Sequence, residues 1–238
     1  MTEPGAQELA ERLAAVRARI AAAARRAGRD PSEVTLVGVT KGVPAERVVA
    51  AVEAGLAELG ESYVQEAGPK IAAVNRAVSN PPRWHLVGRL QRNKAKEAVR
   101  LFQVVESVDR LELARELDRR AAAAGRRLEV LLQVNLSGER QKGGVAPEAL
   151  AELLAACAAL PALEVTGLMT VPAAAPEPEA ARPAFAHLRA LRDALRATPA
   201  GAGLRHLSMG MSGDFEVAVE EGATIVRVGT ALFGPREA

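Results

Sequence analysis

The sequence has little cysteine, few histidines and no strong excess of either charge. Its one cysteine, Cys157, lies in an apolar helical segment, which excludes a disulfide framework and a thiol metal cluster and indicates a reducing, cytoplasmic compartment. The three histidines show no metal-ligand spacing, so no metal site is expected. The formal net charge is only +2 over 238 residues, and we therefore expect no nucleic-acid partner.

Long apolar runs are also missing. The longest ones fall far short of the roughly 20 residues that a membrane-spanning helix needs. The first residues mix glutamates with arginines and contain no apolar stretch that would resemble an export signal. With 49% hydrophobic and 25% charged residues, the chain has the composition of an ordinary globular protein. We expect one domain over residues 1–238 that contacts no membrane.

Strand-like and helical segments alternate along the chain. An amphipathic helix is expected from about Gln7 to Ala27, closed by Gly28, with residues 1–30 packing on the remainder. The predicted strands are Val34–Thr40, Leu56–Gly60, Arg83–Gly88, Phe102–Val108, Leu128–Asn135, Glu164–Thr170, Leu204–Gly210 and Thr224–Thr230. Eight strand–helix units favour an α/β fold, a parallel (β/α)₈ barrel. The alternative, a doubly wound open sheet, would favour a G-x-G-x-x-G fingerprint, which the sequence lacks.

A lysine follows the first predicted strand. In the stretch VTLVGVTKGVP, Val37, Val39 and Lys41 share one face by the two-residue period, so the amine points in the same direction as core valines. The functional interpretation is a Schiff-base lysine whose pKa is lowered by desolvation or nearby positive charge. The alternative is a surface lysine that lays its aliphatic stem along the barrel rim.

An arginine interrupts the last predicted strand. The period places Val226 and Val228 on one face and Arg227 on the other, and we expect the valines to face the helices and the arginine to face the barrel interior. A buried guanidinium needs hydrogen-bond acceptors, which a ring nitrogen or a carboxylate could supply. Half of a buried ion pair is the alternative interpretation.

The loops after strands seven and eight offer main-chain amides to an anion. Ser212 precedes a helix-like segment that it could cap, and Gly229–Thr230–Ala231 supplies further amides after the eighth strand. In a (β/α)₈ barrel these two loops are a frequent site for phosphate. The spacing therefore predicts an anion site at the carboxyl ends of the strands, near Ser208 at the end of strand seven.

Five separated motifs run in order from about Val34 to Gly234. They are VGVTKGVP, GESYVQEA, WHLVGRLQRNK, VNLSGERQKGGV and LSMGMSGDFEVAVEEGATIVRVGTALFG. Together they resemble the pyridoxal phosphate homeostasis proteins, a family of small barrels that bind pyridoxal 5'-phosphate (PLP). The resemblance implies a fold like the N-terminal barrel of alanine racemase, with PLP held as an internal aldimine.

Carried over by position, the resemblance implies that Lys41 forms the aldimine and that Arg227 faces the pyridine nitrogen. It implies that the phosphate is held by residues near the last two strand ends, Ser208, Ser212, Gly229 and Thr230. One position departs from the family: Ser62 stands where members often have asparagine, so we expect a slightly wider or wetter cavity mouth.

Two classes of function are compatible with these residues. A carrier would bind PLP reversibly and deliver it to apo-enzymes, whereas a PLP enzyme would be an amino-acid racemase or a Schiff-base lyase. Racemisation needs a proton acceptor on each face of the substrate, but Tyr63 is the only tyrosine and the chain ends soon after its eighth strand. An arginine facing the ring nitrogen also weakens the electron sink. We therefore expect a monomeric PLP-buffering protein without dedicated turnover.

Overall fold

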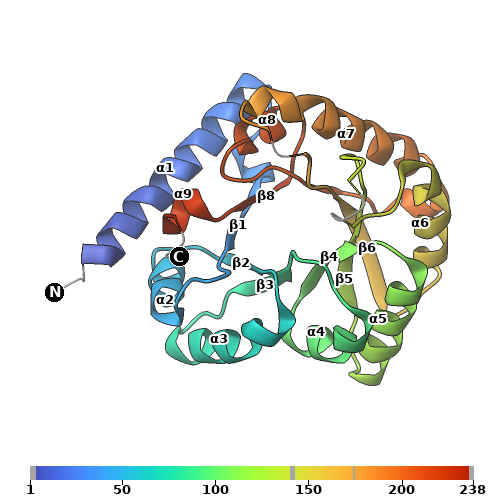
Figure 1. Ribbon diagram of the computed structural model, residues 1–238, viewed down its shortest axis with the longest axis horizontal. Helices are drawn as coiled ribbons and strands as arrows, with labels where there is room; N and C mark the ends of the chain where they lie inside the picture. Colours follow the sequence, from blue (N-terminus) through green and yellow to red (C-terminus); the bar gives the residue numbers. More distant parts are fainter. Residues whose placement is uncertain (1–3, 140–142, 174, 236–238) are drawn as a thin grey trace.

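Eight parallel strands close into a barrel in sequence order (Figure 1). They are β1 Thr35–Val39, β2 Glu58–Glu61, β3 Arg83–Leu86, β4 Val104–Val108, β5 Leu128–Gln133, β6 Leu163–Met169, β7 His206–Ser208 and β8 Ile225–Val228. The first and last strands pair in parallel, with Val37 opposite Arg227. The structure is a computed structural model, and it describes residues 4–139, 143–173 and 175–235. Residues 140–142, within the motif VNLSGERQKGGV, lie outside this description.

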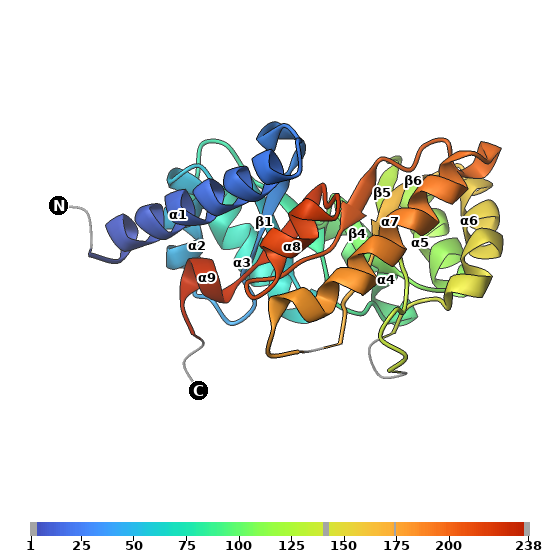
Figure 2. The same cartoon turned by 90° about the horizontal axis from the view of Figure 1, so that it is seen from above.

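Helices follow the strands and surround the barrel (Figures 1 and 2). The α-helices are α1 Pro4–Arg26, α2 Ala45–Glu53, α3 Val64–Ala77, α4 Ala95–Leu101, α5 Leu111–Ala123, α6 Leu150–Ala158, α7 Arg182–Arg196, α8 Phe215–Glu220 and α9 Thr230–Phe233. Short 3₁₀ turns cover Pro31–Glu33, Arg92–Lys94, Pro147–Ala149, Pro178–Ala181 and Pro199–Gly201. In the part of the chain that is described, every helix is too short or too polar to cross a lipid bilayer.

This topology confirms the predicted (β/α)₈ barrel, and all eight predicted strands are present with shifted ends. The second strand begins at Glu58, later than predicted, because the preceding residues still close the turn after α2. Gly55 has a φ of +94°, and the Leu56 amide donates to Ala51 O. The eighth strand ends at Val228, earlier than predicted, because Gly229 already caps α9, which begins at Thr230.

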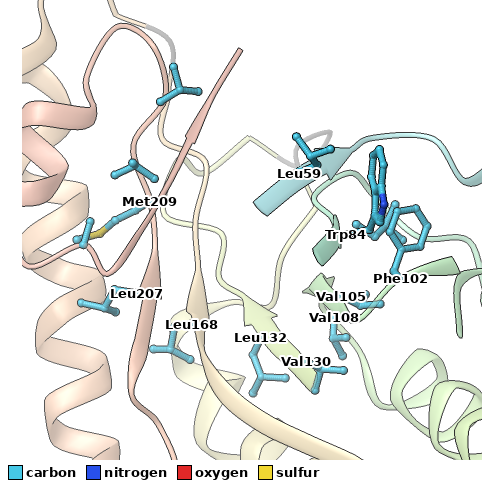
Figure 3. Close-up of a cluster of buried hydrophobic side chains, with 14 of the residues drawn as sticks. Leu59, Trp84, Phe102, Val105, Val108, Val130, Leu132, Leu168, Leu207 and Met209 are labelled. Carbon is cyan, nitrogen blue, oxygen red and sulfur yellow. The ribbon is translucent and has the colours of Figure 1, made fainter. Parts of the chain in front are cut away.

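The period of two divides the apolar strand residues between two clusters. The barrel interior contains a small cluster formed by Val37, Val104, Leu131, Met169 and Ile225. The larger cluster lies between strands and helices, and Figure 3 shows strand residues such as Trp84 and Leu132 in it, with Trp84 beside Phe102. Because the interior cluster is small, the remaining inward positions are free to carry polar side chains.

Helix α1 packs along one side of the barrel against α8, α2 and α9, and Figure 2 shows it projecting beyond one end. Its apolar side chains recur every three or four residues and are buried, as expected for an amphipathic helix: Leu9, Leu13, Val16, Ile20, Ala23 and Ala24. The Cζ atom of Arg19 on α1 lies 4.6 Å from the centre of the Phe215 ring on α8, and the same guanidinium pairs with Glu216 at 2.8 Å. Helix α1 therefore supports the segment between β7 and β8.

Candidate functional site

A cavity of about 820 Å³ opens at the carboxyl ends of the barrel strands. It is lined by Val39, Lys41, Val43, Ser62, Tyr63, Val87, Gly88, Arg89, Val171, Met211, Ser212, Gly213, Arg227, Gly229, Thr230, Phe233 and Gly234. Five of the six residues that the sequence singled out are therefore brought together in one place. Ser208 is the exception, because it is not among the lining residues.

The end of β1 holds Lys41 at the cavity wall. Lys41 is partly buried and lines the cavity together with Val39, as the shared face predicted. The preceding residue, Thr40, is fully buried, and its main chain and side chain are both fixed. Its carbonyl accepts from Lys70 Nζ at 2.6 Å, and its hydroxyl donates to Glu61 Oε1 at 2.7 Å. Glu61 and Lys70 themselves pair at 2.6 Å, so a buried ion pair defines where the Lys41 stem begins.

Arg227 points into the barrel interior, on the face opposite Val226 and Val228. It is 4% exposed and reaches the floor of the cavity. Its Nη1 donates to Ser208 Oγ at 2.5 Å and its Nη2 donates to Thr170 O at 2.8 Å. Burial lowers the pKa of the guanidinium, and the nearby carboxylates of Glu106 and Asp214 oppose this effect. An arginine nevertheless stays cationic in proteins, so it presents only donors to the cavity.

Ser212 connects the loops after β7 and β8. Its Oγ accepts from the amides of Gly229 and Ala231, at 3.2 Å each. The prediction that Ser212 caps the helix following it is wrong: α8 begins at Phe215, and Asp214 stands at its cap position without a capping side-chain bond. The hydroxyl instead shows that two main-chain N–H groups converge on one acceptor position at the cavity wall.

Ser208 is fully buried, and its hydroxyl is held between two charged groups. It donates to Glu106 Oε2 at 2.6 Å and accepts from Arg227. Glu106 in turn accepts from His85 Nδ1 at 2.6 Å, and His85 Nε2 lies 2.7 Å from Glu58 Oε2. Ser208 is thus a connection inside the barrel, and this position gives no support to the prediction that its side chain holds a phosphate.

Glu106 and Glu58 lie in the hydrogen-bonded chain that leads to Arg227, and sequence reasoning missed both. Glu106 lies in the apolar strand FQVVESV, two residues after Val104 and therefore on the same face. This period is the one signal in the sequence that its carboxylate points inward. Both ring nitrogens of the buried His85 have carboxylate partners, Glu106 and Glu58. Nothing in the spacing indicated that Glu106 comes within 3.8 Å of Arg227, because the two residues lie on strands that are not neighbours in the barrel.

The charges of this interior chain alternate. Burial by itself would lower the pKa of His85, but its hydrogen bonds to Glu106 and Glu58 outweigh burial and raise the pKa to about 9. Burial likewise would raise the pKa of Glu106, but the hydrogen bond and charge of His85, with Arg227 and Ser208, bring it below its usual range. At neutral pH a histidinium therefore lies between two carboxylates, followed by a guanidinium.

The free energy of unfolding should fall as the pH rises from about 6.5 to 9. A histidine whose folded pKa is raised stabilises the protein fully below its unfolded pKa, and this contribution is lost as the pH passes through the folded pKa. We expect a loss of roughly 2 to 3 kcal/mol over this range. Urea unfolding of the PLP-free protein at several pH values measures it. His85→Gln should flatten the profile, whereas His187→Gln on the exposed face of α7 should keep it, and a flat wild-type profile would contradict the assignment.

The cavity rim carries two exposed apolar side chains, Tyr63 at 57% and Met211 at 39%. Gly88 lies directly beneath Ser62: a Cβ at this position would lie 2.2 Å from Ser62 O, so only glycine permits this approach of the loops after β2 and β3. Within the described ranges, no group of three His, Cys, Asp or Glu side chains is arranged to hold a metal ion. The groups that could attract an anion to this cavity are Lys41, Arg227 and the two main-chain amides that converge at Ser212.

Family and sequence comparisons agree with this geometry. The family described as "Alanine racemase, N-terminal domain" matches residues 12–237. The pyridoxal phosphate homeostasis protein of Pseudomonas aeruginosa is 47% identical over 96% of this chain and 96% of its own length. The protein of the same name from Aquifex aeolicus is 46% identical, covering 95% of this chain and 98% of its own.

Solved structures share this fold, two of them over nearly their whole length. PipY from Synechococcus elongatus, solved with PLP bound, has a TM-score of 0.83 and 37% identity and covers 95% of this chain and 100% of its own. An unknown protein from Bifidobacterium adolescentis reaches a TM-score of 0.91 at 37% identity, covering 98% and 97% of the two chains. Alanine racemase of Clostridium difficile shares the fold alone, at 16% identity and a TM-score of 0.67, with 87% of this chain and 56% of its own covered. The motifs, the barrel and sequence identities of 46–47% over nearly the full length all agree, so the chain belongs to the pyridoxal phosphate homeostasis protein family.

Proposed function

We propose that this protein binds PLP in the cavity at the carboxyl ends of its strands, holds it covalently through Lys41, and buffers or delivers it without a dedicated turnover. One observation carries the proposal. Lys41, Arg227 and the convergent amides beside Ser212 come from three separate loops or strands and line a single cavity. Near full-length relatives named for PLP homeostasis, and a related structure solved with PLP bound, support it.

The residues of the cavity match the groups of PLP one by one. PLP supplies an aldehyde that condenses with a primary amine, and Lys41 is the lysine of the lining. Two amides that meet at Ser212 Oγ are suited to a phosphate oxygen, because such an oxygen accepts hydrogen bonds in the same way as the hydroxyl. Thr230 is exposed beside them and can add its own amide or hydroxyl. Arg227 offers donors to the ring nitrogen.

The interior charges favour storage over catalysis. Arg227 stays cationic and tied to Ser208 and Thr170, so it can only donate to a ring nitrogen, which must then remain unprotonated. An unprotonated ring withdraws electrons weakly, which disfavours the carbanion chemistry of racemases and lyases. The chain's own contribution is therefore to bind and orient the cofactor and to leave its ring poorly activated.

Among the lining residues that the structure describes, the remaining titratable groups supply no second acid or base that is shielded from water. Besides Lys41 and Arg227 the lining contains Tyr63 and Arg89, and both are exposed at the rim. A racemase requires a second group placed against the substrate and shielded from water. The same open rim suits the exchange of PLP with solution or with an apo-enzyme. Delivery to such enzymes, a monomeric state and a cytoplasmic location stay predictions.

A turnover assay separates the carrier from the enzyme. The purified protein loaded with PLP is incubated with L-alanine, and separately with a 3-hydroxy amino acid such as D-threonine, beside free PLP at the same concentration. We expect a bound chromophore, no turnover above free PLP, and recovery of activity when the loaded protein is mixed with an apo PLP enzyme. Racemisation or cleavage well above the free-PLP rate would contradict the carrier function, and alanine racemase serves as the positive control.

A further inference from the structure

A continuous hydrogen-bonded chain of side chains runs through the barrel interior to the cavity floor. It passes from the β2 residue Glu58 to His85 on β3, to Glu106 on β4, across the barrel to Ser208 on β7, and to Arg227 on β8. The side chains in the middle of this chain are almost completely buried, with His85 at 2%, Glu106 at 0% and Ser208 at 0% exposure. We call this chain the interior relay.

The direction of each hydrogen bond in the interior relay is fixed. Glu106 is ionised and can only accept, so Ser208 must donate to it and must use a lone pair to accept from Arg227. Because its only proton is donated to Glu106, the Ser208 hydroxyl can act only as an acceptor toward the Arg227 guanidinium. The other nitrogen, Nη2, donates to Thr170 O, so two hydrogen bonds fix the plane of the Arg227 guanidinium.

The negative charge of Glu106 also separates two positive charges in the barrel interior. Arg227 and the protonated His85 are two cations inside one barrel, and Glu106 is bonded to His85 at 2.6 Å and lies 3.8 Å from the Arg227 guanidinium. Asp214 acts on Arg227 electrostatically as well, but its carboxylate is engaged with the Met211 amide at 2.6 Å. Without the carboxylate of Glu106, repulsion between the two cations would favour other orientations of the guanidinium.

We propose that Glu106, acting through Ser208, is a positioning residue that holds the Arg227 guanidinium in its cavity-facing orientation and thereby sets how tightly the protein retains PLP. This inference rests on the proposed PLP binding, but its first half concerns only the protein's own residues. It assigns Ser208 to the cofactor site through Arg227 and not through the phosphate.

The barrel offers a matched control for Glu106. Glu129 on the neighbouring strand β5 is also an inward, mostly buried carboxylate that accepts from a hydroxyl, Thr166 Oγ1 at 2.8 Å, and pairs with an arginine, Arg83. Its hydrogen-bond partners, Thr166 and Arg83, differ from those of Arg227, which are Ser208 and Thr170. Glu106→Gln and Glu129→Gln both remove an inward carboxylate charge, completely buried for Glu106 and mostly buried for Glu129, and only the first interrupts the interior relay.

Two measurements on these variants test the inference. In the PLP-free protein, the Arg227 Nη–H groups that donate to Ser208 and Thr170, followed by ¹⁵N NMR, should lose protection from hydrogen exchange in Glu106→Gln and keep it in Glu129→Gln. In PLP titrations followed by absorbance, Glu106→Gln should raise the dissociation constant about tenfold, as is typical when a residue supporting a direct ligand is lost. Glu129→Gln should stay within about twofold of wild type, as expected for a site with no shared partner.

The outcomes separate the two proposals. If the wild type binds no PLP, the proposed function fails, and the exchange measurement still decides the role of Glu106. If the wild type binds PLP and Glu106→Gln retains both its affinity and the Arg227 protection, the positioning role is overturned. Should Glu106→Gln fail to fold, Ser208→Ala interrupts the same chain with a smaller change and is expected to give the same two effects.

A double-mutant cycle distinguishes the relay from a phosphate contact by Ser208. If Ser208 acts only through Arg227, the double variant Glu106→Gln/Ser208→Ala should retain PLP no worse than the weaker single variant. If Ser208 touches the phosphate independently, the two fold-changes should multiply, and that result would contradict the assignment of Ser208.

Discussion

Replacing Lys41 with alanine should abolish covalent retention of PLP. Among the described residues that line the cavity, Lys41 alone carries a primary amine. We expect the visible absorbance of lysine-linked PLP to disappear and the remaining PLP to be removed completely by dialysis. The free energy of unfolding should change by less than about 1 kcal/mol, because Lys41 is only partly buried and follows the end of its strand.

Lys96→Ala is the control for this result. Lys96 is exposed on α4, so the variant removes the same positive charge without changing the cavity. It should keep the wild-type absorbance. An unchanged spectrum in Lys41→Ala, or an equal loss in Lys96→Ala, would show that the attachment site lies elsewhere.

Arg227→Met should weaken both the fold and the retention of PLP. The change keeps the aliphatic volume but removes the charge and two hydrogen bonds, which leaves Glu106 with His85 as its remaining cationic partner. Breaking a buried ion pair in this way costs about 3 kcal/mol, which corresponds to a Tm lowered by roughly 10 °C in a chain of this size. Loss of a charged hydrogen-bond donor to the ligand should raise the PLP dissociation constant by about tenfold or more.

Arg196→Met provides the comparison, because Arg196 is exposed in the last turn of α7. Urea unfolding of the PLP-free variants and PLP titration of the folded variants measure the two effects separately. A destabilised Arg227→Met that still retains PLP at wild-type affinity would restrict the arginine to a structural role.

Much of the barrel could be predicted from the sequence because its signals are local. The period of two in TIVRVGT is enough to place Arg227 inside the barrel, since strand side chains must alternate between faces. The carboxyl ends of parallel strands meet at one face of a barrel, so residues following different strands were expected around one cavity, and five of the six are.

The partners of these residues could not be predicted, because they depend on geometry across the barrel. Ser208 and Glu106 are 102 residues apart, and their contact follows from the stagger of strands four and seven. A phosphate contact by Ser208 is what the family resemblance implies, and it stays a prediction, because the hydroxyl is engaged with Glu106 and Arg227 in the barrel interior. The cap predicted for Ser212 failed for a related reason: the loop before α8 turns the hydroxyl toward the amides after β8.

Borohydride reduction followed by peptide mapping tests the central claim most directly. The purified protein is incubated with PLP, reduced, digested and analysed by mass spectrometry. We predict that the mass of reduced PLP is found on Lys41 as the main modified site. Modification spread over exposed lysines, with Lys41 unmodified, would contradict the account.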